Sequence, residues 1–411
     1  MKTFVTGLAI VACTVVAGCS QQEIPTPIEK VSDVSLGISA KVSSTQTKAV
    51  VEGGAIAYAV KDYASQPGMG VVVLNGAGDG FYKTDLAGSH IWFMGDDKGQ
   101  TWKSISALGT NFAGATEASY ELTDAIGTVY AYYPKQAVVT GSTAAALACE
   151  APLKSTGTIT VSADETNAEM KFGANGWKAN TADAIKKVLA APEEVDYLYA
   201  SNTGRNVNSG CVGGGTSEGN AGTTNPGRVI TLEMKHALTK VSFLVYNDGT
   251  LPGAGSLTAI EIRNVSGKTA FVAPASGATM KLANGAIVAT GATGDKITRT
   301  ITGYTVPKKI GTGGTEDQYN FKETTTVTGP AVARKVSLLV YPLTTIPANE
   351  IEVVFTIDGS AYAVNLPNTT AAAWVAGNNY LYTVRASERK LSVTGVSVTD
   401  WVTTPGGNID L

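Results

Sequence analysis

Residues 240–249 read Lys-Val-Ser-Phe-Leu-Val-Tyr-Asn-Asp-Gly, and this stretch decides the fold. In its first seven residues, the apolar Val241, Phe243 and Val245 stand at every second position. This is the period of a β-strand that buries one face. The Asn-Asp-Gly that follows is typical of a turn. The stretch therefore predicts a short strand that ends in a tight turn.

The same pattern recurs from one end of the chain to the other. It is found at residues 34–38, 257–262, 335–341 and 352–357. Each run is bounded by Gly, Pro, Asn or Asp, and many short alternating runs separated by turns are typical of β-sandwiches. Helical signal is scarce, and the best helix candidate is residues 181–191, which end before Pro192. We therefore predict an all-β protein.

Length and a break in composition indicate how the chain is divided. A chain of 411 residues is long enough for two domains. Residues 202–227 are mostly Gly, Ser, Thr and Asn, so they predict a loop or linker without core-forming side chains. We place a domain boundary near residue 228, which gives an N-terminal β-sandwich at 31–228 and a C-terminal β-sandwich at 229–411.

The charge balance argues against nucleic acid as a partner. The chain has 31 Lys and Arg and 34 Asp and Glu, so its formal net charge is −3 and no basic surface is indicated. Charged residues make up 16% of the chain, below the ~25% of an average soluble domain. Short strands and tight turns rich in Gly and β-branched residues fit this composition.

The amino terminus has the features of a lipoprotein export signal. Lys2 precedes a short apolar run at residues 4–17, and this run is shorter than the ~20 residues of a membrane-spanning helix. The run ends in Val-Ala-Gly-Cys, which resembles a lipobox. We therefore predict a signal peptide at 1–18 and lipidation of Cys19. An ordinary signal peptide followed by a chance cysteine is the alternative.

The predicted lipid would hold the protein on a membrane. Two or three acyl chains on Cys19 anchor stably, because each buried methylene contributes ~0.8 kcal/mol. Residues 19–30 are polar and contain Pro25 and Pro27, so they predict an extended tether between the lipid and the folded part.

Few other residues are candidates for chemistry. Cys149 and Cys211 are left after the signal is removed, and a disulfide and two free thiols both stay open, because export permits a bridge but the spacing does not require one. His90 and His236 lie far apart, and no Cys-x-x-Cys or His-Glu-x-x-His spacing for a metal occurs. We expect a structural role for His236, no cofactor and no enzymatic activity.

Five fragments of the sequence follow one another in the order found in a family of pilins. They are Thr-Val-Tyr-Ala-Tyr-Tyr-Pro at 128–134, Asp-Tyr-Leu-Tyr-Ala at 196–200, Leu-Glu-Met-Lys-His-Ala-Leu-Thr-Lys-Val at 232–241, Trp-Val-Ala-Gly-Asn-Asn-Tyr-Leu-Tyr at 374–382 and Val-Ser-Val-Thr-Asp-Trp at 396–401. Together they resemble the fimbrillin family, the pilins of type V pili and their Mfa-like relatives. Glu233 and Met234 are a mild departure, since phenylalanine is usual in that neighbourhood.

The resemblance implies two transthyretin-like β-sandwiches in tandem and a structural role in pilus building and cell adhesion. In this family, lipoprotein precursors reach the outer membrane, and an extracellular trypsin-like protease removes the first strand. The freed edge then takes up a strand of another subunit, because unpaired backbone groups beside apolar surface are a template for strand addition. The implied partners are therefore other pilin subunits, in a homopolymer or a mixed pilus, together with the outer membrane and the protease.

The candidate for the removable strand is residues 31–41. A trypsin-like protease needs a basic residue in an accessible segment, and Lys48 follows the polar residues 45–47. We therefore predict cleavage between Lys48 and Ala49, with Lys41 as the alternative position. A first strand that is never removed, with Lys48 as a solvated side chain, is the other interpretation.

The candidate donor strand is the tail at 391–411. Its apolar residues form two pairs, Leu391 with Val393 at odd-numbered positions and Val396 with Val398 at even-numbered positions. In a regular strand the two pairs would point to opposite faces. A bulge or bend at Gly395 would let both pairs face apolar surface. The alternative is that this tail completes the C-terminal sandwich of its own chain.

A cell-surface glycan-binding lipoprotein is the alternative function. It would need exposed aromatic rings, and the cluster of Tyr130, Tyr132 and Tyr133 could stack on a sugar. Alternation puts at least one of these rings into a core, so we prefer core packing for the cluster. The other aromatic candidates are Trp92, Trp102 and Trp177.

Overall fold

The computed structural model describes residues 35–42, 51–52, 55–56, 69–75, 80–83, 90–95, 102–105, 119–134, 139–140, 149–152, 158–162, 170–173, 176–179, 195–200, 205–207, 229–273, 278–289, 295–306, 335–366, 373–388 and 391–400. All of them belong to one compact unit, Val34–Leu411. The predicted domain boundary near residue 228 lies between two described segments and stays a prediction.

Every regular element in the described ranges is a β-strand, which confirms the predicted all-β class. The helix predicted at 181–191 lies outside the described residues. Within those ranges there is no helix long and apolar enough to cross a membrane.

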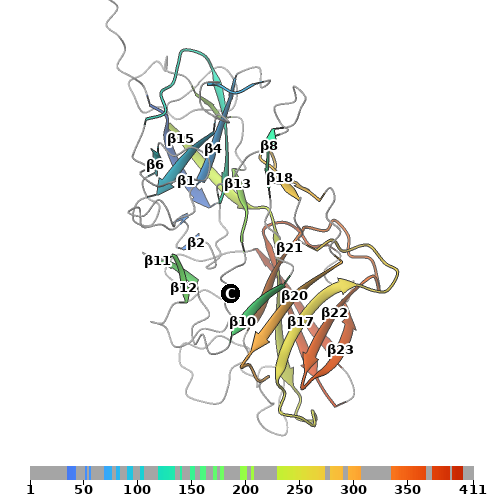
Figure 1. Ribbon diagram of the computed structural model, residues 1–411. Coiled ribbons are helices and arrows are strands. Elements are labelled where there is room, and N and C mark those ends of the chain that lie inside the picture. Colours follow the sequence, from blue (N-terminus) through green and yellow to red (C-terminus); the bar gives the residue numbers. More distant parts are fainter. Residues whose placement is uncertain are drawn as a thin grey trace, which may run out of the picture. The chain divides into compact units, whose positions relative to one another are not determined.

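The first sheet has eight strands and closes on itself (Figure 1). Its order is β13-β15-β1-β6-β5-β4-β7-β14, and β13 also pairs with β7, so all of these strands except β14 form a ring. The strands are β1 (Gly37–Val42), β4 (Met69–Asn75), β5 (His90–Gly95), β6 (Trp102–Ile105), β7 (Gly127–Tyr133), β13 (Leu198–Ala200), β14 (Arg205–Val207) and β15 (Val229–His236).

Strand β4 is apolar on both faces because both faces are covered. Val71 belongs to one buried cluster and its neighbour Val72 to another. A strand with two buried faces reads as a continuous apolar run instead of an alternating one. Gly70 allows close packing here, because a Cβ at this position would collide with the ring of Tyr132 on β7.

Two further sheets enclose the largest core of the described part, with the orders β10-β20-β17-β22-β23 and β21-β16-β24-β25 (Figure 1). Their strands are β10 (Thr158–Ser162), β16 (Thr239–Asn247), β17 (Leu257–Asn264), β20 (Lys296–Thr302), β21 (Lys335–Val340), β22 (Ile351–Ile357), β23 (Ser360–Asn365), β24 (Asn378–Ala386) and β25 (Leu391–Asp400). The strand predicted from residues 240–249 is β16, and Phe243 meets Phe355 edge to face with 5.5 Å between ring centroids. Such aromatic pairs stabilise a core beyond the area they bury.

Strands from both sides of residue 228 share sheets. β10 runs parallel to β20, and a four-stranded sheet of order β19-β18-β9-β8 joins β8 (Val139–Thr140) and β9 (Cys149–Pro152) to β18 (Thr279–Lys281) and β19 (Ile287–Val288). Two small hairpins, β2 (Val51–Glu52) with β3 (Ala55–Ile56) and β11 (Met170–Gly173) with β12 (Gly176–Ala179), complete the described elements.

Candidate functional site

The first strand, β1, is held unequally on its two sides. On one side it runs parallel to β15, and all six of its residues pair with residues 229–234. On the other side, within the described residues, it meets β6 through one pair only, Ile38 with Trp102. A strand with a full ladder on one side alone is close to an edge strand, which another chain can replace.

Leu36 and Ile38 lie in an apolar core. Leu36, just before the strand, is 4% exposed and Ile38 is 6% exposed. The amide of Leu36 also donates a hydrogen bond to the carbonyl oxygen of Tyr120, at 2.8 Å. We call the place that β1 fills between β15 and β6 the β1 seat. Its apolar lining consists of Met69, Val71, Val73, Val129, Ala131, Tyr133, Ile230, Leu232 and Met234.

A buried acid–base pair lies where the ring of strands closes. β13 joins β15 to β7, because Leu198 is opposite His236 on one side and opposite Tyr133 on the other. Just before β13, Oδ2 of Asp196 lies 2.8 Å from Nδ1 of His236, and both side chains are 0% exposed. Burial, and then the charge of Asp196, raise the pKa of Tyr133 above its ordinary value.

This pair connects two of the family-like fragments, those at 196–200 and 232–241. The amide of Ala237 adds a backbone hydrogen bond to Tyr197, at 2.8 Å. His236 is thus packed and paired, as expected for a structural role. Its partner Asp196 was not predicted, because no local spacing relates residues so far apart in the sequence.

Hydrogen bonds inside the core hold the aromatic residues of the fragment at 374–382 in place. Nε1 of Trp374 donates to the hydroxyl of Tyr382 at 3.1 Å. The amide of Val375 donates to the hydroxyl of Tyr380 at 2.9 Å. Burial raises the pKa of Tyr382 to about 12, against a smaller lowering effect of the Trp374 hydrogen bond. These residues fix the turn before β24.

The C-terminal strand β25 pairs with β24 of its own chain. The register shifts at Thr394, because Val393 faces Val384 and Gly395 faces Thr383. This bulge confirms the predicted bend at Gly395. It places the four apolar tail residues opposite buried residues of β24, with the pairs Leu391–Ala386, Val393–Val384, Val396–Tyr382 and Val398–Tyr380.

Val393, Val396 and Val398 of the tail strand are less deeply buried than Ile38 of β1. Val393 and Val396 are partly buried against the large core, and Val398 is 42% exposed. β25 is also the last strand of its sheet in the described part of the chain. It therefore completes its own sheet here, and it does so as an edge strand.

A model of the fimbrillin-like family matches residues 64–401, which is most of the chain. The chain belongs to the fimbrillin-like family. A search of curated proteins finds no match to this fimbrillin-like chain.

Three solved structures similar to the fimbrillin-like chain come from Bacteroides species. A candidate cell adhesion protein of Bacteroides uniformis is 15% identical, with a TM-score of 0.43 and 90% of this chain and 100% of that chain covered. One of Bacteroides ovatus is 12% identical, with a TM-score of 0.47 and 90% and 99% covered. A fimbrial protein of Bacteroides vulgatus is 13% identical, with a TM-score of 0.42 and 89% and 99% covered.

The three clustered tyrosines of the fimbrillin-like chain are core residues. Tyr130 is 9% exposed, Tyr132 0% and Tyr133 1%. Tyr133 belongs to the core at the β1 seat, and the other two pack in the cluster on the opposite face. The prediction of core packing is therefore confirmed, and these rings offer no surface to a sugar. The side chains of Trp92, Trp102 and Trp177 lie outside the described part.

Several predicted site residues lie outside the described ranges. They are Cys19, Lys48, Ala49 and Cys211. The backbone of Cys149 forms part of β9, but its side chain is not among those described. Lipidation, cleavage and the cysteine pairing all stay predictions.

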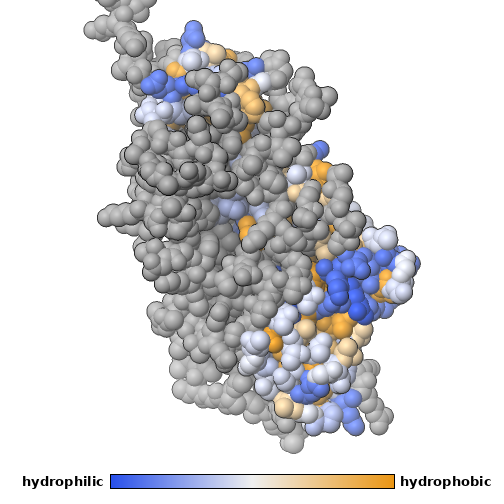
Figure 2. Space-filling view, viewed as in Figure 1, coloured by the Kyte–Doolittle hydropathy of each residue, from blue (hydrophilic) through white to orange (hydrophobic). Residues whose placement is uncertain are grey.

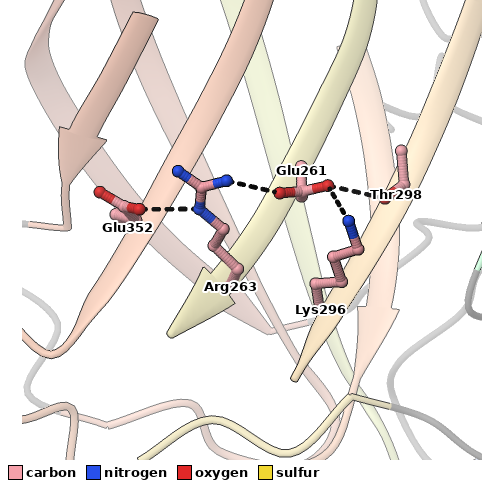
Figure 3. A network of polar contacts seen from close by, with 5 residues as sticks. All are labelled: Glu261, Arg263, Lys296, Thr298 and Glu352. Carbon is pink, nitrogen blue, oxygen red and sulfur yellow. Dashed lines mark hydrogen bonds and ion pairs between the residues drawn. The ribbon is translucent and has the colours of Figure 1, made fainter. Parts of the chain in front are cut away.

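A row of polar contacts crosses β17, β20 and β22 (Figure 3). Nε of Arg263 lies 2.7 Å from Glu352, its Nη1 lies 3.1 Å from Glu261, and Nζ of Lys296 lies 3.2 Å from Glu261. The hydrogen bond to Glu352 is the main cause that raises the pKa of Arg263. Such solvated pairs contribute ~0–1 kcal/mol each. Figure 2 shows a mixture of hydrophilic, neutral and hydrophobic residues on the described surface of this face.

Proposed function

We propose that this chain is a structural subunit of a type V surface pilus that is assembled by protease-triggered strand exchange and supports cell adhesion. Membership of the fimbrillin-like family supports the general role. The observation that carries the mechanism is the seat of β1, which has a six-residue ladder on one side, one pair on the other, and an apolar lining.

The proposed assembly is driven by the cost of leaving the β1 seat empty. Without β1, residues 229–234 of β15 would present unpaired N–H and C=O groups beside apolar surface. A strand from a second subunit would restore these hydrogen bonds and cover the apolar lining. Because this contact joins two different surfaces, it does not close on itself, and repeated contacts produce a filament.

The proposed maturation precedes assembly. Lipid on Cys19 would hold the precursor on the outer membrane, and a trypsin-like protease outside the cell would cut between Lys48 and Ala49. The cut would turn β1 from part of the chain into a separate peptide, which is then free to leave its seat. The proposed role requires neither catalysis by this chain nor a cofactor.

The proposed donor is the tail that includes β25. It is an edge strand with partly buried side chains, so its release would break one ladder and little core packing. A straight donor strand presents one parity to a seat. The tail would therefore offer either Leu391 with Val393 or Val396 with Val398, unless it keeps its bulge.

Limited trypsin treatment tests the proposed function. The sample is purified precursor without residues 1–19, and amino-terminal sequencing and native gel mobility are read on the same digest. We expect a new terminus at Ala49 and a ladder of multimers. Lys48→Gln should abolish both, whereas Lys41→Gln should abolish neither. A chain that stays monomeric after the cut, or that is never cut near Lys48, would contradict the proposal.

A further inference from the structure

Strand β15 forms one wall of the β1 seat, and its support is uneven along its length. β1 pairs with residues 229–234. On its other side, among the described residues, β15 pairs with β13 only through Met234, Lys235 and His236. When β1 leaves, residues 229–233 would lose the ladder that the described part provides for them. This part of β15 would then be held only by its buried side chains and by the pairing of the C-terminal end of β15 with β13.

The Asp196–His236 pair lies at that C-terminal end. His236 is two residues beyond Met234, the last β15 residue that pairs with β1. Nδ1 of His236 lies 2.8 Å from Oδ2 of Asp196 in a site with no exposed side-chain surface, a close polar contact without the geometry of a hydrogen bond. Loss of one partner would leave the other polar group alone in a buried site, which costs free energy. The pair is therefore a buried polar contact between the end of β15 and the residues just before β13.

We propose that the Asp196–His236 pair is a positioning device that keeps β15 in place while the β1 seat is empty. This inference rests on the proposed function, in which β1 leaves. Neither Asp196 nor His236 is among the residues that pair with β1. It acts through β15, by fixing the end of the wall on β13, which is itself fixed on β7 by Leu198 and Tyr199. An incoming strand then meets a wall of the correct shape.

Hydrogen–deuterium exchange of the full chain tests this role without any need for cleavage or assembly. Exchange of β1 amides reports release of β1, and exchange at residues 235–237, whose backbone partners lie on β13 and at Tyr197, reports loss of the attachment of β15. His236→Leu removes the polar partner of Asp196 at similar side-chain volume. We expect it to speed exchange at 235–237 by roughly tenfold to a hundredfold, and to leave β1 nearly unchanged.

Two variants separate positioning from a general loss of stability. His236→Asn places an amide N–H near the position of Nδ1 and should restore most of the protection of β15. Glu352→Gln removes the charge of a partly buried contact with Arg263, which lies at 2.7 Å, and should leave β15 unchanged. If His236→Leu does not fold, Asp196→Asn is the substitute, because it changes the side chain less. Exchange in β1 and in β15 is then compared in the same way.

Three results would overturn the inference. They are equal acceleration in β1 and at residues 235–237, unchanged exchange at residues 235–237, and no recovery in His236→Asn. The proposed function fails separately. If the selective effect on β15 is found but cut protein takes up no strand, the pair positions β15 and the strand-exchange mechanism is wrong.

Discussion

The hydroxyl of Tyr382 is a buried acceptor, and Trp374 is its partner at 3.1 Å. Both side chains have 0% exposure. A buried N–H without an acceptor costs more than a hydrogen bond gains, because the group has lost water and found no replacement. This single contact therefore fixes two of the three aromatic side chains of the fragment at 374–382.

Removal of that acceptor should destabilise the fold measurably. Tyr382→Phe leaves Nε1–H of Trp374 buried without its partner, so we expect the free energy of unfolding to fall by about 1–3 kcal/mol. Urea denaturation measures it. Val375→Thr, at a side chain that is 51% exposed, is the matched control and should change stability by less than ~0.5 kcal/mol. Equal effects of the two variants would contradict the assignment.

Alkaline pH should destabilise the fold, because burial disfavours the ionised form of Tyr382. The pKa of Tyr382 is raised to about 12, above the ~10 of an unfolded tyrosine. The neutral form is thus favoured in the folded state, and its contribution is complete below about pH 10 and is lost as the pH rises to about 12. Between these pH values the wild type should lose more stability in urea titrations than Tyr382→Phe does. Parallel losses would show that another group is responsible.

The strands themselves were largely predictable, whereas their partners were not. Residues 240–246 alternate and form β16, and the change of parity around Gly395 correctly predicted a bulge in β25. No local pattern predicted that β1 runs parallel to β15 or that β13 closes the ring. Long-range packing decides which distant strands pair and in which register. The alternation of apolar residues along one strand does not contain this information. The Asp196–His236 pair was missed for the same reason.

The bulge in β25 gives a prediction at the scale of one strand. Deletion of Thr394 removes the extra residue, so one of the two apolar pairs must turn to the solvent face. We expect a loss of about 2–3 kcal/mol, measured by urea denaturation, with faster hydrogen exchange in β25. Thr394→Ser keeps the residue count and should be nearly neutral. A deletion that is as mild as this substitution would contradict the register.

At the scale of the whole molecule, the two strands proposed to move are the first and the last of the described part (Figure 1). β1 is held by one full ladder and one single pair, and β25 lies at the edge of its sheet. Neither strand is therefore threaded between two full ladders. The proposed strand exchange would therefore remove one strand and release another at the edges of their sheets.

A reversible lock on β1 tests the central claim most directly. Ser39 and Thr231 are neighbours in the parallel ladder. Adjacent strands lie about 4.8 Å apart, within the Cα–Cα span of disulfides. The precursor without residues 1–19 would carry Ser39→Cys and Thr231→Cys, with Cys149→Ser and Cys211→Ser to remove other thiols.

The locked precursor is cut by trypsin at Lys48, and its multimers are followed on native gels before and after addition of a reductant. We predict that the oxidised protein stays monomeric although it is cut, and that reduction produces the ladder of multimers. Multimers that form while β1 is locked in its seat would contradict strand exchange.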